Sequence, residues 1–291
     1  MSLVLGATVL GLLAGGIYGV MASGIALTFG VMRIINIGHA ALVIAGAFLA
    51  YELFSQFHID PFLGLLITMP LMFVVGVALE VVFIRPLKTD RTEMSVLVTV
   101  GMALAIEGVL GYFFGTNLVQ INVSYGTATF QAWGVHIPWV YVYGFVLAGA
   151  SMAALALLLH RTTFGAAIRA TTLNRQAAEL IGIDTERVSA VAFGIGAALA
   201  AVGGTVYGIV TPFFPDSYYD LVGHLLTIVV LGGLGSMRGA FIAALLIIGL
   251  QDVMSVLISP DWADLTYFVA LMVVLILRPQ GLFALRVREA I

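Results

Sequence analysis

The stretch MSLVLGATVLGLLAGGIYGVMASGIALTF, residues 1–29, contains no acidic or basic side chain. Its apolar run is longer than the ~20 residues that a helix needs to cross a bilayer. It lacks the basic first segment of a secretory signal peptide and exceeds the apolar core of one, so we expect a retained first span. The apolar pattern is continuous rather than alternating, which predicts a helix and not a barrel strand.

The composition extends this prediction to the whole chain. Of 291 residues, 62% are hydrophobic and 9% are charged, and the mean hydropathy is +1.13. A soluble domain is about a quarter charged, so these values indicate a polytopic membrane protein. With no cysteine, the chain has no disulfide, thiolate nucleophile or sulfur metal site. A net charge of −3 is too small to indicate a nucleic-acid partner.

Polar breaks divide the chain into nine apolar segments, and we expect eight to ten spans in a single membrane domain, 1–291. The segments are 3–29, 37–54, 61–84, 94–114, 139–159, 188–210, 221–234, 239–258 and 265–277. Residues 221–258 as one helix would be roughly 57 Å long, well beyond the ~30 Å of a hydrocarbon core. The helix must therefore break, and GGLGSMRGA, residues 232–240, is the expected position.

The basic residues predict the orientation. They are Arg33, Arg85, Lys88, Arg91, Arg161, Arg169, Arg175, Arg187, Arg238, Arg278, Arg286 and Arg288. If the chain has nine spans, all twelve basic residues lie on the same side of the membrane. The opposite loops, 55–60, 115–138, 211–220 and 259–264, contain no lysine or arginine. The positive-inside rule therefore predicts an outer N-terminus and a cytoplasmic C-terminus.

Several catalytic classes are excluded by missing motifs. A P-loop requires Gly-Lys-Ser/Thr, and the single lysine, Lys88, lies in RPLKTD. The sequence has neither a G-x-S-x-G elbow nor an H-E-x-x-H pair, and its five histidines are scattered. We therefore predict no enzyme activity, no catalytic residue, no metal site and no cofactor in this chain.

Ionisable residues inside spans are costly and are therefore functional candidates. Glu80, Glu107 and Asp252 qualify, with His224 and Gln251 as polar neighbours. A proton-coupled carrier would need such carboxylates in a relay, and Glu107 and Asp252 would serve it. The alternative is a hydrogen bond between helices or a position near the membrane interface. A passive small-solute channel is a third possibility.

The turn MRIINIGHAAL, residues 32–42, contains Asn36 and His39. Unwound backbone at a cavity wall would present their amide and imidazole groups to a substrate. Alternatively, Asn36 is a helix cap and Arg33 only anchors the topology. The candidates for a substrate pathway are Asn36, His39, Glu107 and His224.

The basic loop 160–187 includes FGAAIRATTLNRQAAELIGIDTERV, residues 164–188. Leu173, Ala177, Leu180 and Ile181 recur at helical spacing and predict a short helix with an apolar stripe. Gly182 is expected to end this helix and Asp184 to cap the next, which are roles suited to those residue types. So short a helix has little stability alone and must rest on the membrane, its own bundle or another protein.

Five blocks of the sequence, taken in order, resemble the LivH-type permease subunits of ABC importers for branched-chain amino acids. The blocks are YGVMASGIALTFGVMRIINIGHA, RPLK, FGAAIRATTLNRQAAELIGIDTERVSAVAFGIGAALAAVGG, VVLGGLGSMRGA and LRPQGLF. The resemblance implies an ABC permease bundle in the bacterial inner membrane. It implies a second permease subunit, LivM-like or a second copy, with two cytoplasmic ATPase subunits and an extracytoplasmic binding protein. ATP and Mg would then lie on the partner ATPases.

In ABC importers a cytoplasmic loop with an A-A-x-x-x-G core places a short helix in a groove on the ATPase. The resemblance assigns this coupling role to Arg169, Asn174, Ala177, Ala178, Glu179 and Gly182. It implies transport of branched-chain or related small amino acids, although similar proteins also carry urea and short amides. The sequence departs from the family pattern at Gly38-His39-Ala40, His224 and Arg238, which bears on the substrate. The alternatives are a stand-alone proton-coupled transporter and a urea or amide permease.

Overall fold

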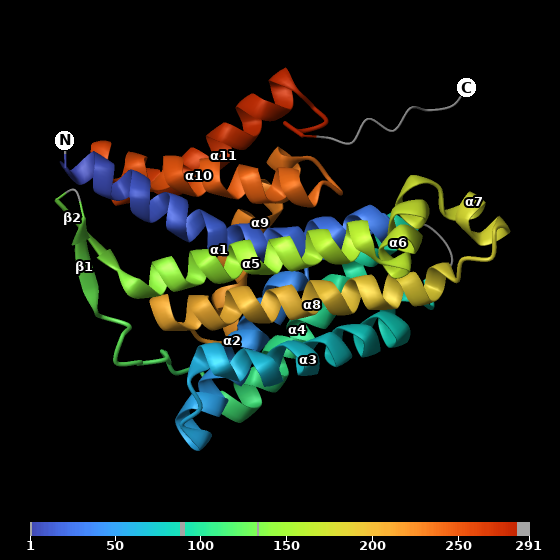
Figure 1. Ribbon diagram of the computed structural model, residues 1–291, viewed down its shortest axis with the longest axis horizontal. Coiled ribbons are helices and arrows are strands. Elements are labelled where there is room, and N and C mark those ends of the chain that lie inside the picture. Colours follow the sequence, from blue (N-terminus) through green and yellow to red (C-terminus); the bar gives the residue numbers. More distant parts are fainter. Residues whose placement is uncertain (1, 88–90, 133, 284–291) are drawn as a thin grey trace.

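Long apolar helices lie side by side in a computed structural model that describes residues 2–87, 91–132 and 134–283 (Figure 1). In chain order the elements are α1 (Ser2–Met32), α2 (His39–Phe57), α3 (Pro61–Leu79), the π-helix η1 (Glu80–Ile84), α4 (Arg91–Phe114), β1 (Thr129–Ala132), β2 (Val135–Pro138), α5 (Trp139–Arg161), α6 (Thr163–Leu173), α7 (Arg175–Leu180), α8 (Thr185–Val210), the 3-10 turn η2 (Pro215–Ser217), α9 (Tyr218–Gly232), α10 (Met237–Leu257) and α11 (Pro260–Leu277). Within the described ranges the strands form one antiparallel hairpin.

The prediction of an all-helical polytopic membrane protein is confirmed. Among the residues described, seven helices are long and apolar enough to cross a membrane: α1, α2, α3 with η1, α4, α5, α8 and α10. The other two predicted segments form α9 and α11, which are not among these seven. Helix α9 has only 15 residues, and the apolar part of the 18-residue α11 is shorter, Leu265–Leu277. The chain breaks between Gly232 and Met237, as predicted. The count of nine spans stays a prediction.

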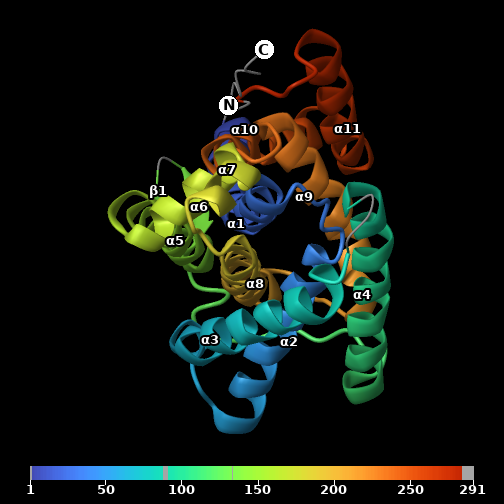
Figure 2. The same cartoon turned by 90° about the vertical axis from the view of Figure 1, so that its right-hand side faces the viewer.

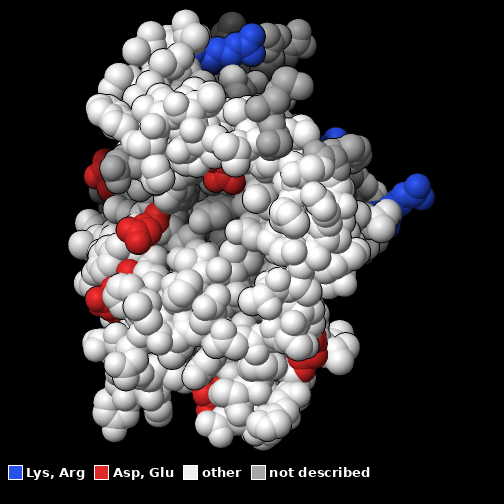
Figure 3. Space-filling view, turned by 90° about the vertical axis from the view of Figure 1, so that its left-hand side faces the viewer, with Lys and Arg blue, Asp and Glu red and all other residues white. Residues whose placement is uncertain are grey.

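The two ends of the bundle differ in charge. Arginines at helix ends gather at one end, where Arg85 Nη1 lies 3.9 Å from Glu186 Oε2 and Arg238 Nη2 lies 3.0 Å from His160 Nε2. We call this the basic end; α6 and α7 project from it (Figure 1). The opposite, acidic end contains the hairpin, and Figure 3 shows acidic side chains across that face. Lys88, Arg286 and Arg288 lie outside the described residues.

Helix α8 lies at the centre, with α1, α2, α3 and α5 packed around it (Figure 2). Its most apolar window is 89% buried, the largest share of any candidate span among the described helices. Glycine permits this contact because small residues let helix backbones approach closely in membranes. At Gly204 an added Cβ would overlap the Val43 carbonyl oxygen of α2 and lie 2.9 Å from the Ala47 nitrogen.

Substituting Gly204→Ala is expected to destabilise the protein by about 1–3 kcal/mol, because rigid backbone of α2 occupies the space. Gly101→Ala is the matched control: it also lies inside a span, yet no described atom lies within 4 Å of its Cβ position. Alanine there is expected to be neutral or to stabilise α4 by up to about 1 kcal/mol. Unfolding of the purified protein in SDS measures both, and equal free energies for the two variants would contradict the packing argument.

The chain unwinds between α1 and α2. Residues 33–38 are not helical, and Arg33 has a left-handed φ of 55°. Polar side chains of α4 bind this segment: Ile35 N donates to Ser95 Oγ (3.3 Å) and Ile37 N donates to Thr99 Oγ1 (3.2 Å). Irregular backbone at membrane depth is tolerated where protein buries and satisfies it. The segment places His39 at the start of α2, within the core.

Candidate functional site

The predicted loop between α5 and α8 forms two short helices, each started by a side-chain cap. Thr162 Oγ1 accepts from Gly165 N (2.9 Å) at the start of α6, and Asn174 Oδ1 accepts from Ala177 N (3.0 Å) at the start of α7. Asp184 Oδ1 accepts from Arg187 N (3.0 Å) and caps α8, which confirms the predicted cap. Caps of these types each stabilise a helix by about 1 kcal/mol.

Gly182 ends α7 as predicted. Its φ is +84°, and the hydrogen bonds of Gly182 N to Glu179 O (3.0 Å) and Ile183 N to Ala178 O (3.0 Å) form a Schellman motif. The predicted stripe was wrong in one respect. Leu173 belongs to α6, because Asn174 is extended, with φ −155° and ψ 106°, and separates the two helices. A strong cap residue broke a helix that periodicity alone would continue.

Helix α7 lies beyond the ends of the long helices (Figure 1). Its C-terminal end carries two exposed apolar side chains, Leu180 and Ile181, which we call the apolar tip. Leu180 is 88% exposed and Ile181 75%, whereas Ala178 is only 2% exposed because it packs inside the chain. Ala177 is exposed beside the tip. Large apolar side chains that project from a membrane protein's end are typical of a contact with another protein. The sequence analysis placed Leu180 and Ile181 in the apolar stripe but did not include them among the predicted coupling residues.

Glu179 and Arg175 are engaged within the loop. Glu179 Oε1 accepts from Thr185 Oγ1 (2.6 Å) and from Arg175 Nε (3.1 Å), and it ties α7 to the start of α8. The hydrogen bond from Thr185, with Arg175 as a second cause, lowers the pKa of the Glu179 carboxyl below its ordinary value. Arg169, on α6, makes no hydrogen bond or ion pair with any residue that the structure describes. Arg169 is therefore free to pair with an external carboxylate.

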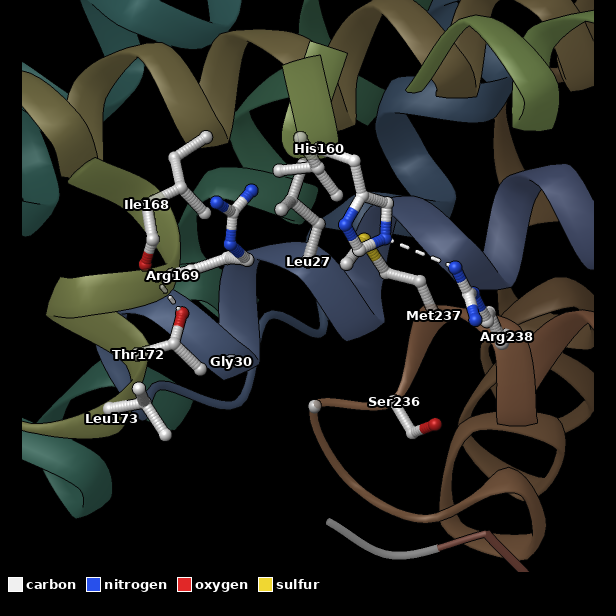
Figure 4. A pocket seen from close by; sticks show the side chains of 12 residues that line it. Leu27, Gly30, His160, Ile168, Arg169, Thr172, Leu173, Ser236, Met237 and Arg238 are labelled. Carbon is white, nitrogen blue, oxygen red and sulfur yellow. Dashed lines mark hydrogen bonds between the residues drawn. The ribbon is translucent and has the colours of Figure 1, made fainter. Parts of the chain in front are cut away.

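A groove of about 360 Å³ lies at the basic end next to α6 (Figure 4). Leu27 and Gly30 of α1, Leu159 and His160 of α5, Ile168, Arg169, Thr172 and Leu173 of α6, and residues 235–238 line it. Figure 4 shows Arg169 and the Arg238–His160 pair entering from opposite sides. The groove and α7 together make a surface that combines apolar side chains with positive charge. Residues 235–238 were predicted as part of a helix break, and Arg238 as a departure from the family pattern, but not as the lining of a groove.

The substrate-pathway candidates lie in separate places. His39 Nε2 is 3.0 Å from Met21 O in the core, and the buried Asn36 amide has no hydrogen-bond partner among the residues that the structure describes. Glu107 Oε2 accepts from Tyr218 Oη (2.8 Å) near the acidic end. His224 and Asp252 both line a second cavity. No single site unites them, and their roles stay predictions.

Comparison with known proteins identifies the family. Residues 7–277 match a family model described as branched-chain amino acid transport system / permease component. The chain is 25% identical to the high-affinity branched-chain amino acid transport system permease protein LivH of Salmonella typhimurium, over 94% of this chain and 92% of the relative. The chain belongs to this family of branched-chain amino acid transport permeases. Two further relatives have similar descriptions.

BraD of Pseudomonas aeruginosa, a high-affinity branched-chain amino acid transport system permease protein, is 28% identical over 94% of this chain and 93% of its own length. A probable branched-chain amino acid transport permease protein LivH of Methanocaldococcus jannaschii is 26% identical over 80% of this chain and 75% of its own. No solved structure matches. Family membership and the seven long apolar helices confirm the prediction of a multi-pass inner-membrane permease.

Proposed function

We propose that this permease is the membrane subunit of an ATP-driven importer that carries branched-chain or related small amino acids delivered by an extracytoplasmic binding protein. The exposed apolar tip of α7, at the end where the arginines gather, supports this proposal most directly. The positive-inside rule predicts that this end is cytoplasmic. A cytoplasmic ATPase would bury Leu180 and Ile181 there, and Arg169 would pair with one of its carboxylates.

The proposal assigns ATP hydrolysis to other chains. The sequence has no Walker lysine, since Lys88 in RPLKTD is its single lysine. As the resemblance to ABC importers implies, ATP and Mg would lie on two partner ATPase subunits, and closure of those subunits would pull α7 with it. The first turn of α8 follows α7 through the Glu179–Thr185 hydrogen bond, so a movement of α7 reaches the central helix of the bundle. A second permease subunit, LivM-like or a second copy of this chain, completes the pathway.

Uptake of radiolabelled L-leucine into proteoliposomes tests this function. One set contains the chain alone, and the other adds the second permease, the ATPases and the binding protein. We expect uptake that requires ATP and the complete set. Uptake by the chain alone under a proton gradient would overturn the proposal in favour of a proton-coupled carrier, and ATP-independent equilibration of urea or acetamide would favour a passive permease.

A further inference from the structure

A second cavity, of about 190 Å³, lies among α1, α5, α8, α9 and α10. Its polar lining consists of Tyr18, Tyr141, Tyr207, Thr211, His224, Gln251 and Asp252. These residues come from α1, from α5 and from the consecutive helices α8, α9 and α10, with Thr211 at the C-terminal cap of α8. No residue of the coupling loop is among them, so the cavity is separate from the groove at the basic end.

The three tyrosines and the acid face the cavity without internal partners. The hydroxyls of Tyr18, Tyr141 and Tyr207 and the carboxylate of Asp252 form no hydrogen bond or ion pair with the residues that the structure describes. Polar groups inside a membrane protein are normally paired, because each unpaired group is costly away from water. The arrangement therefore offers one negative charge and three hydroxyls to a ligand.

The neighbouring His224 makes a hydrogen bond through each of its ring nitrogens. His224 Nδ1 lies 2.9 Å from the Asp220 carbonyl oxygen, which can only accept, so Nδ1 carries the proton. His224 Nε2 lies 3.4 Å from Gln251 Nε2 and accepts from that amide. Of the lining residues, Asp252 is the one acid and none is lysine or arginine.

The complementary ligand is a small cation with an organic ammonium group. Tyrosine ring faces attract ammonium groups, and a carboxylate pairs with them through charge-assisted hydrogen bonds. A hard metal ion would require six or more oxygen ligands, which a single carboxylate and three phenols do not provide. The volume is below the ~300–1,000 Å³ of pockets for drug-sized ligands, so the ligand must be small.

Asp252 is also reachable from the acidic end. A third hollow, of about 460 Å³, is lined there by the start of α1, by residues 134–136 of the hairpin and again by Asp252. The two hollows meet at this side chain. Figure 3 shows the acidic face hollowed near its centre with acidic side chains beside the hollow. A ligand arriving at this face meets Asp252 before the tyrosines.

We propose that Asp252, with Tyr18, Tyr141 and Tyr207, binds the protonated amino group of the amino acid that this permease carries. The assignment of the ligand as transported substrate rests on the proposed function. The ammonium site itself rests on the cavity. The carboxylate gives the site its preference for an amine, and the hydroxyls accept the remaining hydrogen bonds of the ammonium group.

Isothermal titration of the full-length protein in lipid nanodiscs tests the site with two fragments of leucine. The probe 3-methylbutylamine retains the amine and lacks the carboxylate, whereas 4-methylpentanoate retains the carboxylate and lacks the amine. We expect the amine to bind and the acid not to bind. Asp252→Asn should weaken amine binding about 30-fold or more, because it removes one partner of a charge pair. Tyr207→Phe should weaken it about three- to tenfold.

Glu52→Gln is the matched control, since it removes a carboxylate from α2 outside both hollows, and it should leave amine affinity unchanged. Equal affinity in the Asp252→Asn protein, or equal binding of both fragments, would overturn the site. ATP-driven uptake by the complete transporter is measured in parallel. If ATP-driven uptake is observed but Asp252→Asn does not weaken amine binding, the proposed ammonium site is wrong and the importer function is supported. If Asp252→Asn weakens amine binding but the complete transporter shows no ATP-driven uptake, the importer function is wrong and the ammonium site is supported.

Discussion

Replacement of both Leu180 and Ile181 by aspartate is expected to abolish ATPase capture and ATP-driven uptake while leaving the permease folded. The two side chains are 88% and 75% exposed, so the fold loses little when they change. Burying each against a partner contributes about 1.5–3 kcal/mol, and the loss of both corresponds to at least a hundredfold weaker binding. Co-purification of the ATPase with the tagged permease measures this loss directly.

Leu118→Asp is the control for that variant, because Leu118 is a 67% exposed leucine in the loop at the acidic end. It should leave ATPase capture unchanged. Normal capture by the double aspartate variant would show that α7 is not the docking element. Charge reversal at Glu179 would be harder to interpret, since its carboxylate binds Thr185 and Arg175 within the loop. Arg169, without such a partner, is the better position for reversing a charge.

Substituting Thr99→Val is expected to destabilise the protein by about 1–3 kcal/mol for each backbone group that it leaves unpaired. Thr99 Oγ1 accepts from Ile37 N and donates to Ile35 O, both at 3.2 Å. Valine has nearly the same shape and can do neither. The unwound segment 33–38 would then carry unsatisfied polar groups in a largely buried position. Unfolding in SDS measures the free-energy change.

Thr68→Val provides the comparison, because Thr68 is 1% exposed and its Oγ1 has no hydrogen-bond partner within the described part of the chain. Removing an unpaired buried hydroxyl is expected to be neutral or stabilising. The two variants make the same chemical change at two buried positions. Equal destabilisation would mean that Thr99 acts through packing, and the support of the unwound segment would have to lie elsewhere.

Local chemistry made much of the coupling loop predictable. Gly182 ends α7 and Asp184 caps α8 because these residue types suit those positions in any context. The predicted stripe failed at Leu173 because the Asn174 cap outweighed the helical period. Sequence spacing likewise could not show that Glu179 is already paired, because its main partner, Thr185, lies across a turn.

The sequence alone determined the class of the protein, because long apolar runs must become helices in a bilayer. The positions of the arginines also distinguish the basic end of the bundle from the acidic end. The sequence also determined the break at residues 232–240, because one continuous helix would exceed the membrane. Only the tertiary structure decided which helix faces meet. Tyr18, Tyr207 and Asp252 lie on three distant helices, and they share a cavity because α1 packs against both α8 and α10. Helical periodicity defines the faces of a helix, whereas packing selects their neighbours.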